Sequence, residues 1–245
     1  MPGKLRLALL TALGLMLGPL SAWAGPRELV LECDHLPPAC NTPADGSPGF
    51  MIDIGQEALR RAGFSAQVRI VPWKRAMQDA EYHNDTLIVY FARTPEREAS
   101  FRWIDITNQT TFAFMTKEQA PPVDTLAQAQ MLGAIGIRAG SSVRSWLIEH
   151  GIAATMLQES TLETMARMLK AGRVPVFFGA PSTFVPLYTK LNGSRPVVGA
   201  PLYASDNWLA SGLGFPAGDA ARIGAAVRAM KADGSITAIL AKYGQ

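Results

Sequence analysis

The sequence of 245 residues is poor in the residues that most enzymes and metal sites use. Its three histidines, His35, His83 and His150, lie in no nucleophile elbow, no paired-histidine metal motif and no other recognisable catalytic setting. It has no glycine-rich phosphate loop, so nothing in it indicates a bound nucleotide. It also lacks basic runs and basic stretches interleaved with aromatic residues, which argues against nucleic acid as a partner. We expect no cofactor.

Cysteine is scarce as well, because only Cys33 and Cys40 are present. In an exported chain an even pair at this spacing favours a local disulfide, which would close a loop already stiffened by Pro37 and Pro38. The alternative is a metal site built from the two cysteines and His35. That site lacks a fourth ligand, and its spacing matches no standard zinc pattern, so no metal is expected.

Long apolar runs are absent except near the N-terminus. Lys4 and Arg6 precede an apolar run over residues 7–20, which leads into Ala22-Trp23-Ala24, and this order is typical of a signal peptide over residues 1–24. The run is shorter than the ~20 residues of a membrane span, although a retained membrane anchor is the alternative. Neither cysteine lies at the cleavage site, so no lipid anchor is expected. We therefore expect export to an oxidising compartment.

Net charge and length limit the possible organisation of the chain after residue 24. Lys4 and Arg6 belong to the 23 lysines and arginines that face 20 acidic residues, so the chain after residue 24 is close to neutral. It is long enough for two lobes with separate cores of about a hundred residues each.

Strand and helix patterns alternate in two sets along this chain. The first set predicts a strand at 28–33, a helix that ends at Gly63, a strand at 67–71, a helix at 73–80 and a strand at 86–91. The second set predicts a strand at 132–137, a helix at 141–150, a strand at 155–157, a helix at 161–171 and a strand at 174–178. Further helices are predicted at 181–191, 219–232 and 235–242. Two such sets predict an α/β fold with two doubly wound, mainly parallel sheets.

Several short clusters stand in a characteristic order on this chain. They are Gly49-Phe50-Met51-Ile52-Asp53, Pro72-Trp73-Lys74-Arg75-Ala76, Arg93-Thr94-Pro95-Glu96-Arg97, Lys231-Ala232-Asp233-Gly234-Ser235 and Lys242-Tyr243-Gly244. Together they resemble the bacterial periplasmic solute-binding proteins of family 3, which deliver small polar solutes to ABC importers. The resemblance covers nearly the whole chain after residue 24.

This resemblance implies a two-lobed periplasmic-binding-protein fold of type II, joined by a two-strand hinge. Lobe 1 would comprise residues 25–113 and 207–245, and lobe 2 residues 114–206. The chain would cross into lobe 2 at Thr110–Thr116 and return near Ser205–Leu209. The resemblance also implies a periplasmic location and a monomer.

Arg97 matches the arginine that grips the ligand's α-carboxylate in the amino-acid binders of the family. It follows a predicted strand at the carboxyl edge of a parallel sheet, where open α/β sheets bind ligands. Its two parallel N–H donors suit two carboxylate oxygens. The alternative is a surface arginine that pairs with Glu96, Glu98 or Asp105.

Gly140, Ser141 and Ser142 match the family's ligand turn, at the start of a predicted lobe-2 helix. Backbone N–H groups and hydroxyls there would favour an anionic group, although a simple helix N-cap would look the same in sequence. Trp73 and Tyr90 are the aromatic residues best placed to stack on a ligand, but Trp73 could equally belong to the core.

Two departures from the family's amino-acid binders bear on the ligand. Tyr90 and Ala92 stand where those binders carry small residues or hydroxyls. Ala180 stands where they carry the aspartate that holds the ligand's ammonium group. An ordinary amino acid would then bury an unpaired ammonium, unless Asp34 or Asp206 substitutes for that aspartate.

Positive charge near the cleft favours an anion. Arg93, Arg97 and Arg138 could all approach it, so we expect a small polar solute that is anionic or bears a carboxylate, either amino-acid-like or an organic acid. An ABC transporter permease is the expected partner, and no enzymatic activity is expected. The alternatives are a sensory protein that presents its ligand to a membrane receptor, and an enzyme similar to cyclohexadienyl dehydratase. The enzyme would need an acid group over the substrate, which Ala180 does not supply.

Overall fold

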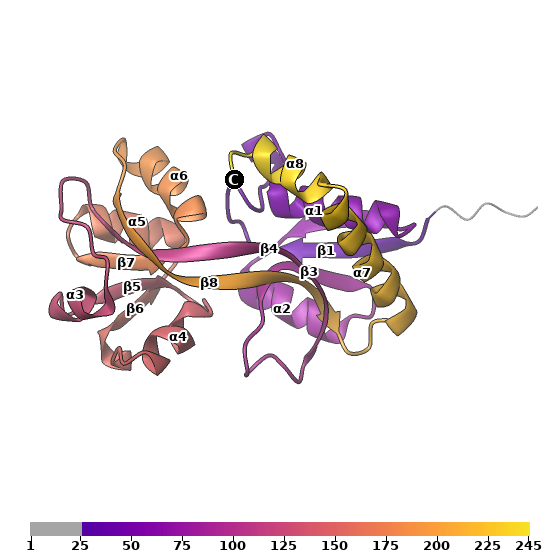
Figure 1. The fold of residues 1–245 in the computed structure, drawn as a ribbon, viewed down its shortest axis with the longest axis horizontal. Helices are drawn as coiled ribbons and strands as arrows, with labels where there is room; N and C mark the ends of the chain where they lie inside the picture. The colour runs from indigo at the N-terminus through magenta and orange to yellow at the C-terminus, as the bar shows by residue number, and fades with distance from the viewer. Residues whose placement is uncertain (1–25) are drawn as a thin grey trace, which may run out of the picture.

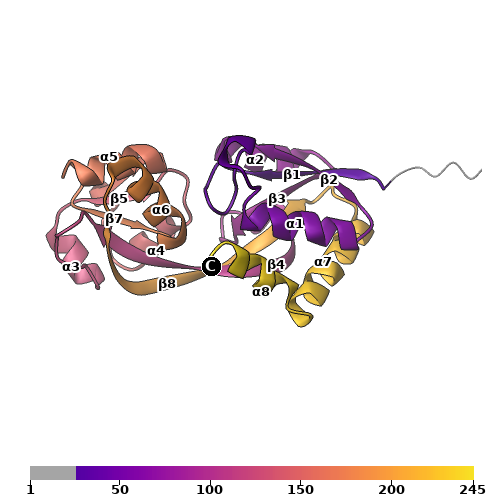
Figure 2. The same ribbon diagram turned by 90° about the horizontal axis from the view of Figure 1, so that it is seen from above.

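The computed structural model describes residues 26–245, so the predicted signal peptide lies outside the described residues. None of the helices in the described part combines the length and hydropathy needed to cross a membrane. Two lobes are visible, and two long strands pass between them (Figures 1 and 2). The two-lobed α/β fold expected from the sequence is confirmed.

Eight strands form one sheet in the order β2-β1-β3-β8-β4-β7-β5-β6. Their bounds are β1 Glu28–Cys33, β2 Ser65–Ile70, β3 Thr86–Ala92, β4 Phe101–Thr116, β5 Ile135–Arg138, β6 Leu157–Ser160, β7 Val176–Gly179 and β8 Val197–Gly212. The outer strands of each lobe are parallel, whereas β4 and β8 pair antiparallel with each other and with their neighbours. The long pair β4 and β8 therefore links two mainly parallel halves.

The helices cover both faces of each half of the sheet (Figures 1 and 2). Their bounds are α1 Phe50–Arg61, α2 Trp73–Tyr82, α3 Leu126–Met131, α4 Val143–Glu149, α5 Leu162–Lys170, α6 Pro181–Asn192, α7 Ala217–Ala232 and α8 Ser235–Lys242. Lobe 1 carries α1, α2, α7 and α8, and lobe 2 carries α3 to α6. Helices α7 and α8 come from the end of the chain but pack beside α1, as the resemblance implies.

Most predicted elements are present, but several bounds differ, and the two long crossing strands were predicted only in part. Strand β1 and helix α8 have the predicted bounds. Helix α3 was not predicted, and the strand expected at 132–137 begins only at Ile135. The strand expected at 155–157 instead begins at Leu157, after a 3-10 turn at Ala154–Met156. Strand β4 begins at Phe101, well before the crossing expected at Thr110–Thr116.

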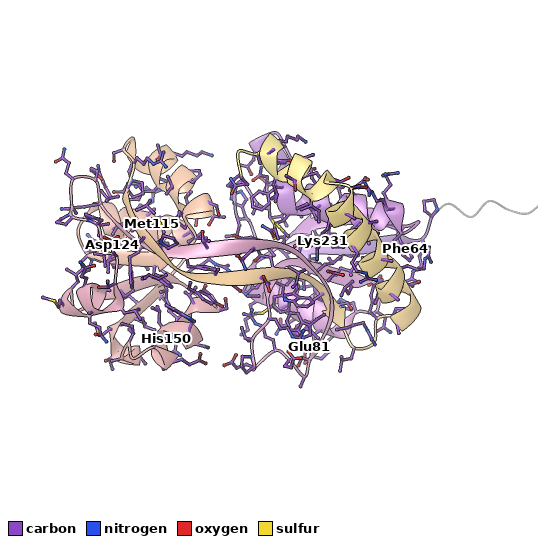
Figure 3. All side chains as sticks on the ribbon, viewed as in Figure 1. Phe64, Glu81, Met115, Asp124, His150 and Lys231 are labelled. Carbon is purple, nitrogen blue, oxygen red and sulfur yellow. A yellow bond between two sulfur atoms is a disulfide. The ribbon has the colours of Figure 1, made fainter. Side chains whose placement is uncertain are left out.

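The two lobes have separate cores, as their lengths allow. In lobe 1, Leu31 of β1 and Val89 of β3 pack against Gly55 of α1, where a Cβ atom would lie 2.6 Å from a Leu31 methyl group. The helix can thus approach the sheet closely. In lobe 2, Met115, labelled in Figure 3, lies at the far end of β4. It is fully buried and belongs to a cluster with Phe177.

The crossing strands are polar where they leave one lobe for the other. Between their pairings with β3 and β7, β4 and β8 pair with each other, as at Thr110 and Ser205. The Asn207 Nδ2 group donates to Thr110 Oγ1 at 2.7 Å and to Asn108 Oδ1 at 3.0 Å. The expected lobe boundaries, between residues 113 and 114 and between residues 206 and 207, fall within these two strands.

The predicted disulfide between Cys33 and Cys40 is confirmed. It closes a loop that runs from the end of β1 toward α1, and both cysteines are fully buried. The metal site weighed as its alternative is therefore wrong, since both sulfurs are in the bridge.

Candidate functional site

A cavity of about 60 Å³ lies between the two lobes. Residues predicted from the sequence to bind ligand line it from both sides: Trp73, Tyr90, Ala92 and Arg97 of lobe 1, and Arg138, Gly140, Ser141, Ser142 and Ala180 of lobe 2. Strands β3, β5 and β7 each end at this cavity. Carboxyl ends of parallel strands are where open α/β sheets bind ligands, so the fold itself brings these residues together.

Arg97 has no carboxylate partner among the described residues. Its Nη1 group donates to the backbone oxygen of Ala92 at 2.9 Å, and its Nη2 group donates to the backbone oxygen of Gly140 at 3.4 Å. The guanidinium also lies over the Phe91 ring, 4.8 Å from its centroid. Burial, and next the positive charge of Arg138, lower the pKa of Arg97 to about 10, so it stays charged at neutral pH.

The surface pairs weighed as the alternative for Arg97 are wrong. Glu98 forms its salt bridge with Arg93, and Asp105 pairs with basic residues of α7. Glu96 lies 3.5 Å from the Ser145 hydroxyl across the cleft. Within residues 26–245, the hydrogen bonds of Arg97 therefore go to carbonyl oxygens, and a half-buried, charged guanidinium without a carboxylate partner is suited to an anion.

Arg138 differs, because it already has a counterion. Its Nη1 group donates to Asp34 Oδ2 at 3.1 Å, and 18% of its side chain is exposed. The guanidinium stacks over Trp73 at 5.2 Å from the ring centroid. Asp34 belongs to lobe 1 and Arg138 to lobe 2, so this pair joins the lobes. Asp34 lines a neighbouring cavity with Arg138 and does not reach the central one.

Gly140, Ser141 and Ser142 form the turn between β5 and α4. The side chain of Ser142, at the N-cap position, makes no capping hydrogen bond within the described chain, and Ser141 Oγ lies 3.5 Å from the Val143 nitrogen. The simple N-cap interpretation is therefore wrong for Ser142. Gly140 has φ +69°, and a Cβ atom there would lie 3.3 Å from Trp73 Cδ1. The turn thus closely approaches the opposite lobe.

Trp73 belongs both to the hydrophobic core of lobe 1 and to the cavity wall. It is 8% exposed, packs with Ala76 and Phe91, and lines the cavity. Its indole Nε1 group is buried and has no hydrogen-bond partner in the part of the chain that the structure describes. The core interpretation of Trp73 therefore holds, and stacking on a ligand stays a prediction.

Tyr90 has a backbone conformation unusual for its residue type. Its φ is +58°, at a register shift between Ile88 and Phe91 where β3 pairs with β8. A non-glycine residue with positive φ at this cavity fits the tendency of such strain to gather at functional sites. Its hydroxyl accepts a hydrogen bond from Thr110 Oγ1 at 3.3 Å, and burial raises its pKa. Tyr90 therefore connects the cavity to the crossing strands.

The described residues place no acidic side chain at the cavity wall. Ala180, which the resemblance aligns with the aspartate of the family's amino-acid binders, stands at this wall just before α6. The carboxylate of Asp206 accepts from Gln109 Nε2 at 3.2 Å and does not line the cavity. The expectation that Arg93 approaches the cleft is wrong as well, because it is paired with Glu98 and stacked on Trp208.

Several lining residues were missed by the sequence analysis: Leu36, Phe112, Leu162, Phe177, Phe178, Gly179, Thr183, Ser205 and Asn207. Ser205 and Asn207 lie in the predicted return strand, so their polarity in this stretch could have indicated that they line the cavity. Nothing in the sequence around Leu36 indicated its position at the cavity. It sits in the disulfide loop of lobe 1, is 3% exposed, and packs into the lobe-2 cluster with Leu162 and Phe177.

Comparison with protein families identifies a model that covers most of the chain. The model described as bacterial extracellular solute-binding proteins, family 3, matches residues 30–245. The chain belongs to this family. The family is described as one of solute-binding proteins. A comparison with curated proteins found no match.

Solved structures with this fold cover nearly all of the family-3 chain. A histidine kinase sensor domain with similarity to periplasmic binding proteins has a TM-score of 0.79 and 18% identity, covering 89% of this chain and 96% of the other. The arginine-, lysine-, histidine-binding protein ArtJ from Geobacillus stearothermophilus has a TM-score of 0.76 and 15% identity, covering 89% and 96%. EhuB in complex with hydroxyectoine has a TM-score of 0.74 and 20% identity, covering 89% and 88%. At these identities the similarity shows the fold alone.

Proposed function

We propose that this family-3 protein captures a small solute bearing a carboxylate between its lobes and delivers it to a membrane partner. The observation that carries the proposal is Arg97, a half-buried and charged guanidinium with no carboxylate partner among the described residues. A ligand carboxylate would supply the missing charge through two parallel hydrogen bonds. Each such bond contributes roughly 1.5–3 kcal/mol when shielded from water.

The cavity favours an organic acid over an ordinary amino acid. An α-amino acid also brings an ammonium group, and burying that group without a carboxylate partner costs several kcal/mol. Ala180 offers no charge, and Asp34 is already paired with Arg138. ArtJ is described as binding basic amino acids, so the proposed ligand class differs from that of a protein with the same fold.

An ABC transporter permease is the proposed partner, for a monomer that residues 1–24 direct to the periplasm. Closure is the proposed mechanism. Each lobe supplies part of the cavity wall, so ligand favours the closed arrangement, and the partner distinguishes closed from open. Binding without chemical conversion is sufficient for this role.

A sensory role is the second candidate, favoured by the structural similarity to a histidine kinase sensor domain. In that case the closed lobes would be presented to a membrane receptor. Neighbouring genes for a permease and an ATPase, or for a sensor kinase, distinguish the two candidates.

A thermal-shift screen tests the ligand class, followed by calorimetry on each hit. Carboxylic acids are expected to stabilise the protein, and plain amino acids are expected to have little effect. At a ligand concentration about 100 times the dissociation constant, the free energy of unfolding should rise by roughly 2.7 kcal/mol. Clear stabilisation by arginine or glutamine, with no response to organic acids, would overturn the proposal.

A further inference from the structure

The two arginines at the cavity differ in one respect, which is the presence of a counterion. Within the described chain, Arg97 hydrogen-bonds to the backbone oxygens of Ala92 and Gly140 and to no carboxylate. Arg138 forms a salt bridge with Asp34, and the exposed fractions of these two side chains are 18% and 26%. The half-buried cluster of two guanidiniums and one carboxylate therefore holds one uncompensated positive charge.

Asp34 is held in this position by its surroundings. Its Oδ1 atom accepts from the backbone N–H of His35 at 2.9 Å, and its Oδ2 atom accepts from Arg138 at 3.1 Å. The preceding residue, Cys33, is anchored by its disulfide. Two residues further on, Leu36 is buried in the hydrophobic cluster of lobe 2. Both carboxylate oxygens are thus engaged, and the loop that carries them is fixed at both sides.

We propose that Asp34 determines the charge of the ligand. As the built-in counterion of Arg138, it leaves Arg97 as the guanidinium of this cluster that needs an anion, so the cavity selects monocarboxylates and rejects dicarboxylates. This inference rests on the proposed function and adds the number of carboxylate groups to it.

Charge balance in this half-buried cluster favours a single ligand carboxylate. A monocarboxylate on Arg97 neutralises the cluster. A dicarboxylate would place its second negative charge beside Asp34, where like charges repel, or would have to displace Asp34 from Arg138. The cavity of about 60 Å³ also leaves little room for water to screen that charge.

Calorimetry with pairs of straight-chain acids tests the inference. Each pair consists of a monocarboxylate and a dicarboxylate with the same number of carbon atoms, so that length is matched and charge is not. The wild-type protein is expected to bind the monocarboxylate of a pair at least ~10-fold more tightly. A wild-type preference for dicarboxylates would overturn the inference and leave the proposed function intact. Absence of binding by any carboxylate would overturn both.

The variant Asp34→Asn removes the charge and keeps the shape of the side chain. It frees the guanidinium of Arg138 for a second ligand carboxylate. One charge-assisted hydrogen bond then shifts the ratio of the two affinities toward the dicarboxylate by ~10- to 100-fold. An unchanged ratio in a variant that still unfolds cooperatively would overturn the inference.

Two further variants separate charge selection from a general loosening of the closed state. Replacing Arg138 as well, in Asp34→Asn with Arg138→Gln, should return the ratio to near its wild-type value, because no second guanidinium remains in the cluster. Ser145→Ala removes a contact with Glu96 that also crosses the cleft but does not touch Arg138. It should change both affinities by the same factor. A ratio shift of equal size in Ser145→Ala would contradict the role of Asp34.

Discussion

The guanidinium of Arg97 in lobe 1 lies 3.4 Å from the backbone carbonyl oxygen of Gly140 in lobe 2. The residue proposed to hold the ligand's carboxylate therefore also contacts the opposite wall of the cavity. Substitutions at either residue should weaken ligand binding, at Arg97 through lost hydrogen bonds and at Gly140 through steric crowding.

Arg97→Ala should abolish binding without loss of the folded state. Two charge-assisted hydrogen bonds of ~1.5–3 kcal/mol each are removed, so affinity for a carboxylic acid should fall at least ~100-fold in calorimetry. Arg93→Ala is the matched control, because Arg93 is paired with Glu98 away from the cavity. Equal affinity in Arg97→Ala and the wild type would remove Arg97 from the site.

Gly140→Ala should weaken binding by crowding the cleft. The new methyl group would lie 3.3 Å from Trp73 Cδ1 and would oppose closure. Gly133→Ala is a matched control, since Gly133 also has positive φ but has no described heavy atom within 4 Å of the added Cβ. Both variants should lose ~1–2 kcal/mol of unfolding free energy from backbone strain, and only Gly140→Ala should lose affinity. Equal affinities in the two variants would show that the turn does not meet Trp73 when ligand is bound.

Leu36→Ala should shift the two lobes of the ligand-free protein toward an open arrangement. Leu36 buries its side chain in lobe 2 only when the lobes meet, and full burial of a leucine contributes ~1.5–3 kcal/mol. The ligand-free variant should have a larger radius of gyration in small-angle scattering, and affinity should fall for all ligands alike. Leu213→Ala, at a position 57% exposed in lobe 1, should change neither quantity. A variant Leu36→Ala as compact as the wild type would argue against this role.

Glu32 should make stability depend on pH. This residue of β1 is 1% exposed, and its Oε2 atom has no hydrogen-bond partner within residues 26–245. Burial, and next the negative charge of Asp79, raise its pKa from the ordinary 4.5 to about 7. The folded state therefore binds more protons than the unfolded state between these values, so the unfolding free energy falls as pH rises through this window.

The variant Glu32→Gln isolates this effect. Between pH 5 and pH 8 the wild type should lose about 2 kcal/mol relative to Glu32→Gln in urea denaturation, because the wild type alone must bury a charge at pH 8. Glu28→Gln, at an exposed position of the same strand, is the control and should follow the wild type. Parallel pH profiles for the wild type and Glu32→Gln would contradict the prediction.

Much of the fold could be predicted because buried parallel strands are short apolar runs separated by amphipathic helices. Strand β1 and helix α8 were predicted with the observed bounds. Helix α3 was missed because it has only six residues. The capping box formed by Thr125 and Gln128 was a local signal that could have located its start.

Cavity residues that lie in short local motifs could likewise be predicted, whereas contacts between residues far apart in the sequence could not. Arg97 and Gly140 could be placed at the cavity because each lies in a short motif that follows a strand. The pairing of Asp34 with Arg138 spans 104 positions in the sequence and has no local pattern. The packing of Leu36 into the other lobe could not be predicted either, since no sequence pattern indicates where a leucine in a loop will pack. Contacts that form only when the two lobes meet can be identified from the structure but not from the sequence.

The two lobes differ in how the chain supplies their cores. Lobe 2 is one uninterrupted stretch between the two crossing strands, whereas lobe 1 needs both ends of the described chain. The lobe-1 core includes Ile223 and Val227 of α7, and Arg61 of α1 forms a salt bridge with Asp233. Truncation before α7 would therefore leave the lobe-1 core without part of its apolar residues, although the segment that forms lobe 2 would still be whole.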